Sequence, residues 1–108
     1  MLPTILDDFL DQEVVDIRGD TVGTLSCYWE SANGLLFLGV RIKDQDVVRV
    51  VPDHNSRVDD RHSCVRLGFS AKMVSSAPPF DCEKEMKVSL EKASTAHFGL
   101  EPIPGHVN

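Results

Sequence analysis

The chain has 108 residues, 42% of them hydrophobic and 26% charged, and a formal net charge of -6. That length suits one domain and leaves no room for a second independent core. Its apolar runs fall well short of the roughly 20 residues that span a bilayer, so we predict no membrane insertion and a cytoplasmic location. Because nucleic-acid affinity comes largely from Lys and Arg, the acidic balance also disfavours unaided binding to DNA or RNA.

An acidic lead-in, residues 1–12, precedes the predicted domain over residues 13–100. In residues 7–20 six acids face a single base, Arg18. The six acids are Asp7, Asp8, Asp11, Glu13, Asp16 and Asp20. Such a surface repels phosphate and favours basic protein partners.

Residues 13–67 consist of short β-branched or aromatic runs separated by polar turns, a pattern typical of strands and not of a helix. Gly19 supplies the positive φ of the first turn, Gly23 predicts a bulge or sharp bend, and Asn33-Gly34 ends the next turn. Residues 53–62 are predicted to form a charged loop. We predict strands over residues 13–17, 21–29, 35–42, 47–51 and 63–67, and a further short strand or turn near 71–74.

The strand over residues 35–42 is the most apolar of the set, and its side chains alternate between two faces. The face that we assign to the core holds Leu36, Leu38, Val40 and Ile42. The opposite face holds Leu35, Phe37, Gly39 and Arg41. This second face either presents aromatic surface to a partner or is covered by the C-terminal helix.

A helix is predicted after Pro78 and Pro79, which end the β half because they remove two backbone donors. Asp81 is its expected N-cap and Gly99 its C-terminal cap. The predicted docking face repeats at helical spacing through Met86, Leu90, Ala93 and His97. We expect the tail, residues 101–108, to be flexible. The predicted fold is therefore mainly β, a small six-strand β-barrel closed by a C-terminal α-helix.

Several stretches, in their order and spacing, resemble the PRC-barrel family, which includes the H subunit of photosynthetic reaction centres and the ribosome maturation factor RimM. They are residues 14–23, with a strand, a Gly turn and a second Gly, 36–42, 50–52, 65–78 with its Ala-Pro exit, and 97–100. The resemblance implies a stand-alone barrel that docks on protein partners, often as a homodimer, and it carries over no catalytic residue. The chain departs from the family in a short polar segment at 43–46, and it has no second domain like the N-terminal one of RimM.

The spacing of the cysteines and histidines gives little support for a metal site or a catalytic site. Three cysteines, Cys27, Cys64 and Cys82, are odd in number and lack CxxC spacing, so we interpret them as reduced thiols that act as small apolar side chains. The best metal-ligand set matches no zinc spacing. It would consist of His54, His62, Cys64 and Asp59 or Asp60. We predict no catalytic residue, no metal, no cofactor and no small-molecule substrate.

The best interface candidate is the outer face of the sheet, where aromatic and basic side chains are expected together. The predicted contact residues are Tyr28, Leu35, Phe37, Arg41 and Arg49. We therefore predict a non-enzymatic protein-binding or assembly module that self-associates as a homodimer. Two alternatives stay open. One is an RNA- or ribosome-associated maturation factor similar to RimM, and the other is a small metal- or thiol-dependent enzyme.

Overall fold

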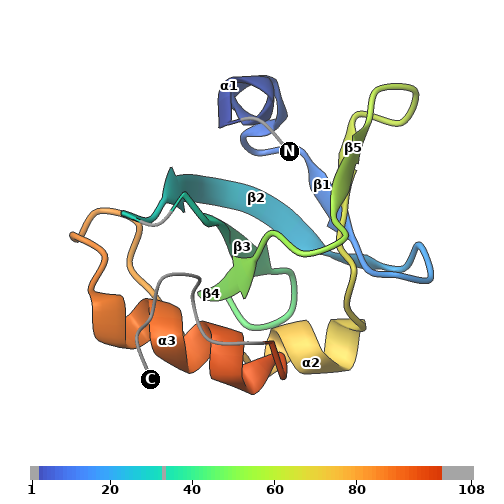
Figure 1. Cartoon of the computed structure of the whole chain (residues 1–108). Coiled ribbons are helices and arrows are strands. Elements are labelled where there is room, and N and C mark those ends of the chain that lie inside the picture. The colour runs from blue at the N-terminus through green and yellow to red at the C-terminus, as the bar shows by residue number, and fades with distance from the viewer. Residues whose placement is uncertain (1–2, 33, 101–108) are drawn as a thin grey trace.

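The computed structural model describes residues 3–32 and 34–100, and the predicted flexible tail lies outside these residues (Figure 1). Two short N-terminal helices, six strands and two further helices follow one another along the chain. They are α1 (Pro3–Leu6), η1 (Asp7–Phe9), β1 (Glu13–Val15), β2 (Thr21–Glu30), β3 (Leu36–Ile42), β4 (Val47–Pro52), β5 (Arg57–Asp59), β6 (Cys64–Arg66), α2 (Ala71–Ser75) and α3 (Val88–His97). In the described part of the chain, none of the helices has the length and apolar character needed to cross a membrane.

The six strands form one mixed sheet in the order β4-β3-β2-β1-β6-β5, so the predicted mainly β fold is confirmed. Neighbouring strands are antiparallel except β1 and β6, which run parallel. The sheet does not close into a barrel within the described residues, because its hydrogen-bonded order ends at β4 and β5. The free edge of β4 bonds instead to the segment after α2, where Val50 N donates to Pro78 O at 2.9 Å and Phe80 N donates to Val48 O at 3.0 Å.

The turns and bends of the β half follow the predicted glycines. Gly19 has φ +93° and Gly34 has φ +80°, as their turns require, whereas Asn33 lies outside the described residues. The strand register shifts between Val14 and Val15, opposite Gly23, which confirms the predicted bulge. A Cβ at Gly23 would lie 1.7 Å from Arg41 O, so only glycine lets β2 and β3 approach this closely.

The main core lies on the predicted face of β3, since Leu36, Leu38, Val40 and Ile42 are all buried in one hydrophobic cluster. Side chains from β1, β2, β4, β6 and the helices complete this cluster. The acidic lead-in also contributes, because Leu6 and Phe9 of α1 and η1 are 0% and 5% exposed within it. The N-terminal helices are therefore packed against the domain and are not a separate extension of it.

Residues 71–75 form the helix α2, and the prediction of a strand or turn near 71–74 is corrected accordingly. Two polar side chains stabilise its first turn. Ser70 Oγ accepts a hydrogen bond from Met73 N at 3.3 Å, and Asp16 Oδ2 accepts one from Ala71 N at 3.0 Å. The sixth strand is instead β5, which forms within the predicted charged loop and pairs with β6.

The helix α3 begins at Val88 and not near Asp81, whose carboxylate binds Glu83 N at 3.0 Å within a turn. Its buried face also differs from the prediction, because Ala93 is exposed and Met86 precedes the helix. The face that packs inward consists of Glu91, Ser94, Thr95 and the C-cap residue Phe98. Ser94 Oγ donates to Val50 O at 2.8 Å, and the Phe98 ring lies 4.3 Å from the Phe69 ring. Gly99, with φ +69°, ends the helix as predicted.

Candidate interaction surfaces

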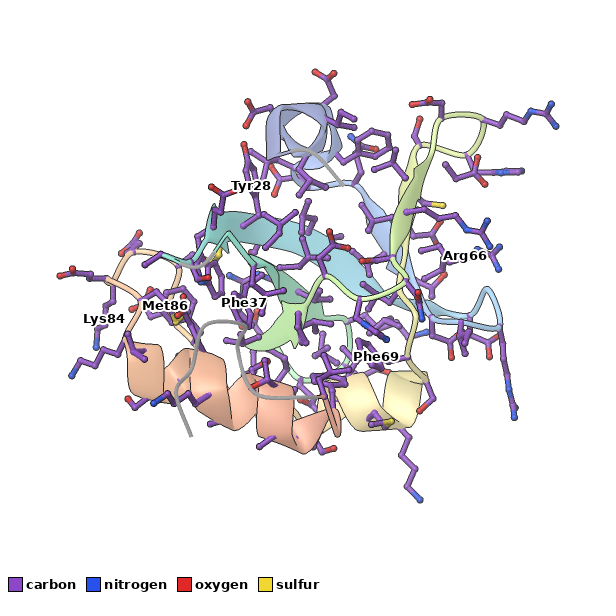
Figure 2. The ribbon with its side chains drawn as sticks, viewed as in Figure 1. Tyr28, Phe37, Arg66, Phe69, Lys84 and Met86 are labelled. Atoms are coloured by element: carbon purple, nitrogen blue, oxygen red, sulfur yellow. A yellow bond between two sulfur atoms is a disulfide. The ribbon has the colours of Figure 1, made fainter. Side chains whose placement is uncertain are left out.

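The outer face of β3 is covered and does not present aromatic surface to solvent. Phe37 is 0% exposed, and its ring stacks on Trp29 at 5.7 Å. Trp29 in turn contacts Phe80 at 5.0 Å, on the segment that runs from α2 to α3. Figure 2 shows Phe37 between the sheet and α3. The expected exposure of Phe37 is therefore wrong. Of the alternative, cover by the C-terminal helix, the cover is found, but the ring contacts come from Trp29 and from Phe80, which precedes α3.

A disulfide joins the cover to the sheet. Cys27 of β2 is bonded to Cys82, which lies 55 residues later in the chain, so the interpretation of these two cysteines as reduced thiols is wrong. Gly39 makes room for the bond, because a Cβ at that position would lie 2.6 Å from Cys27 Sγ. The third cysteine, Cys64, is a buried free thiol. Gly39, which is opposite Cys27 on β3, was the available sequence signal for the disulfide, since this glycine interrupts an otherwise bulky apolar run.

The other predicted contact residues are held in separate local interactions. Tyr28 donates its hydroxyl hydrogen to Asp7 Oδ1, and this bond raises the pKa of the Tyr28 phenol. Arg49 donates to Ala77 O at 2.9 Å and to Gln45 Oε1 at 3.0 Å. Arg41 pairs with Asp46 at 3.0 Å on the surface, and Leu35 is half-buried. The structure therefore does not gather these side chains into one exposed patch.

The most distinctive surface lies elsewhere, on the hairpin formed by β5 and β6. An open hollow of about 630 Å³ is lined there by Arg57, Val58, Asp59, Asp60, Arg61 and Arg66. We call this the arginine hollow. Figure 2 shows Arg66 beside β5, at the side of the molecule that carries the hairpin. None of its three guanidinium groups has a hydrogen-bond or ion-pair partner in residues 3–32 and 34–100.

Two of these arginines oppose each other directly. Arg57 and Arg66 are cross-strand partners in the antiparallel register of β5 and β6. Side chains at such positions lie on one face about 5 Å apart at Cβ, and like charges there are destabilising. An anion placed between the two guanidinium groups would remove that repulsion and accept their hydrogen bonds. The register therefore places two like charges side by side in the arginine hollow, where the chemistry suits a carboxylate or phosphate group.

The acids of the hollow only partly neutralise it. The Asp59 carboxylate already accepts a bond from Arg61 N at 3.1 Å and lies 2.8 Å from His62 Nδ1. The hydrogen bond with His62 lowers the pKa of Asp59, so this acid stays ionised. Asp60 is exposed at the tip. The lining residues carry three positive and two negative charges.

The sequence prediction missed the arginine hollow because it treated residues 53–62 as a solvated loop. The available signal was compositional. Three arginines lie within residues 57–66, in a chain with an overall charge of -6. Their convergence could not be inferred, however, because β5 was not predicted, and the Arg57–Arg66 pairing exists only in its register.

Among the described residues, the structure does not bring the candidate metal ligands of the sequence analysis together into one site. No group of three or more His, Cys, Asp or Glu side chains that could hold a metal ion occurs among the described residues. Cys64 is buried, and burial raises the pKa of its thiol, which disfavours the nucleophilic thiolate. His62 is engaged by Asp59, whereas His97 Nε2 lies 2.8 Å from Met73 O and links α3 to α2.

Comparison with known proteins does not assign a family. No protein-family model matches the chain, and no curated protein matches it.

Proposed function

We propose that the chain is a non-enzymatic protein-binding module of the PRC-barrel type that self-associates as a homodimer. The observation that carries this proposal is the arginine hollow, in which two directly opposed arginines and Arg61 lack partners among the described residues. A surface of this kind is stabilised by an acidic partner. The chain itself is acidic, so another copy of it is the nearest source of carboxylates.

The PRC-barrel assignment is supported by the resemblance of the sequence and by the arrangement of the elements. A curved mixed sheet is followed by a C-terminal helix that packs below it, as Figure 1 shows. The open edge between β4 and β5 is the departure from a closed barrel, and the segment after α2 occupies the β4 side of that opening. The assignment concerns fold, and it adds little about the partner because one fold supports many functions.

The alternative of an RNA- or ribosome-associated factor gains one specific argument from the structure, since guanidinium groups also bind phosphate. The charge around the hollow opposes it. Residues 1–17 contain five acids and no Lys or Arg, and β1 lies directly beside β6. A polyanion that reached the hollow would be repelled by this neighbouring segment. A small enzyme is less well supported, because the one free thiol is buried.

The predicted cytoplasmic location requires that the Cys27–Cys82 disulfide be kept in a reducing compartment. Disulfides persist mainly in oxidising compartments, and cytoplasmic thiols are generally kept reduced. The bond is partly accessible, since both cysteines are half-buried.

Sedimentation velocity of the wild-type protein over a wide concentration range tests the proposed self-association. We expect a dimer whose dissociation constant rises with ionic strength, because charged side chains would carry much of the contact. Arg57→Ala should weaken the dimer, whereas Lys72→Ala on α2 serves as the matched control. A strict monomer at high concentration would refute the homodimer. Tight binding of single-stranded RNA that survives moderate salt would favour the alternative.

A further inference from the structure

The acidic lead-in and the tip of the hairpin that bears the arginine hollow lie at the same end of the sheet, whereas the Arg57–Arg66 pair lies at the other end of these three-residue strands. β1 and β6 run parallel, and Glu13 at the start of β1 is in register with Cys64 at the start of β6. The residues just before each strand therefore lie at the same end of the sheet. Before β1 these are η1 and Asp11, and before β6 they are the hairpin tip with Arg61. Figure 1 shows α1 and the tip of the β5–β6 hairpin projecting from one end of the molecule.

The acids of the lead-in and the arginines of the hollow form no ion pair with each other in the part of the chain that the structure describes. Asp8 and Asp11 are exposed, and neither forms an ion pair with a hollow arginine among the described residues. Asp7 is occupied by Tyr28. The same end also exposes apolar surface, because Ile5 and Leu10 are 38% and 36% exposed on either side of η1. Acidic, basic and apolar groups are thus exposed together on a surface that no other described segment covers.

We propose that two copies of the chain associate through this end, with the Asp8 and Asp11 carboxylates of each copy bound in the arginine hollow of the other. A two-fold axis between the lead-in and the hairpin makes both contacts equivalent, as a symmetric dimer requires. Ile5 and Leu10 lie beside the acids and become covered in the same contact. This inference rests on the proposed homodimer and names the surface that forms it.

Pairing of the two β5 edges is a less suitable alternative for this dimer. β5 has only three residues, and charged Arg57 and Asp59 flank its single apolar residue, Val58. Short edge strands with charged side chains are typical of edges protected against strand addition. The contact is therefore formed by side chains, in which a guanidinium group can bind a carboxylate with two parallel hydrogen bonds.

A charge-exchange experiment tests this geometry directly. One variant reverses the hollow, R57E/R61E, and the other alters the lead-in, D8K/D11N. Asn is chosen at position 11 because Asp11 has φ +65°, a conformation that Asn tolerates and Lys does not favour. Each variant alone should dimerise at least about tenfold more weakly than wild type, since like charges would face each other at both contacts. An equimolar mixture should recover a dimer, because opposite charges then meet at both contacts.

Native mass spectrometry of the mixture identifies the recovered species, which must contain one copy of each variant. The matched control K72E/K92E alters the same number of cations on α2 and α3, and it should leave the wild-type dimer unchanged. Circular dichroism verifies that each variant is folded, and the milder pair R57A/R61A and D8N replaces any variant that is not. R57A/R61A and D8N should each still form a weaker dimer than the wild type.

The outcomes separate this inference from the proposed function. A wild-type dimer that neither variant weakens, or a mixture that gives no mixed dimer, overturns the surface proposed here and leaves the homodimer intact. A wild-type protein that stays monomeric overturns the homodimer itself. Equal weakening by K72E/K92E would indicate a general charge effect and would also overturn the proposed surface.

Discussion

The two halves of the sheet differ in length, cover and chemistry. Strands β2, β3 and β4 have 10, 7 and 6 residues, and every residue of β3 except Arg41 is buried. Strands β1, β6 and β5 have three residues each, and they end in a charged hairpin. In the long half, the segment around Phe80 covers the outer face of the sheet, and the Cys27–Cys82 disulfide links that segment to β2. The short half carries the unpaired arginines.

This difference separates the parts of the chain that hold the fold from the part that is available to a partner. The buried side chains of β3 stabilise the fold and are not available for binding. A side chain such as Phe37 cannot contact a partner unless the rings that cover it move away. The short half needs fewer apolar contacts, and its exposed charges add little to stability. Function is therefore expected at the hairpin end, although the aromatic residues that first indicated an interface lie in the long half.

The largest expected effect comes from breaking the covered face. Phe37→Ala should lower the free energy of unfolding by about 3–5 kcal/mol, because the variant loses a fully buried ring and its stacking on Trp29. Urea denaturation followed by Trp29 fluorescence measures it. Arg41→Ala is the control on the same strand face, and its exposed ion pair with Asp46 should change stability by less than about 1 kcal/mol. Equal, small effects of both substitutions would show that Phe37 is not covered.

The disulfide tests whether the cover depends on a covalent link. Removing it with C27S/C82S should lower the free energy of unfolding by about 2–4 kcal/mol, because a bond across 55 residues restricts the unfolded chain. Thermal unfolding with and without reductant gives the same comparison in the wild type. Gly39→Ala sharpens the test, since its Cβ would clash with Cys27 Sγ. The substitution should cost less in C27A/C82A than in the disulfide-bonded protein, and equal costs would contradict the observed packing.

The long half was predictable because strand alternation is a local signal. The core face of β3, the β2–β3 hairpin and the glycine turns all follow from side chains that are close in sequence. The bonds that hold the cover were missed because Cys27 and Cys82, or Ser94 and Val50, meet only after the chain has folded. The same limit explains α3, where a hydrogen bond to Val50 O and the contact of Phe98 with Phe69 select a face other than the apolar stripe. The arginine hollow depended on β5, a strand too short and too charged to predict.

The short half depends instead on a buried carboxylate. Asp16 is 3% exposed, and its oxygens accept bonds from Arg18 N and Asp20 N at 2.9 Å and from Ala71 N at 3.0 Å. These bonds fix the β1–β2 turn and join it to α2, which lies 55 residues further along the chain. Asp16→Asn keeps the size of the side chain but loses the charge. Its amide group can also no longer accept from both directions. We expect it to lower the free energy of unfolding by about 1.5–3 kcal/mol.

The pH dependence of that loss distinguishes a charge effect from a packing effect. Burial alone would raise the pKa of Asp16, but the backbone donors of Asp20, Ala71 and Arg18 lower it further than burial raises it. A carboxylate whose pKa is lower in the folded state stabilises the fold above the unfolded pKa of about 3.9 and loses that contribution as the pH falls through the folded value. The stability difference between wild type and D16N should therefore be constant from about pH 5 to 8 and shrink below about pH 4. A difference that persists unchanged in acid would mean that Asp16 acts through its shape, and the turn would then owe its stability to packing and not to the buried charge.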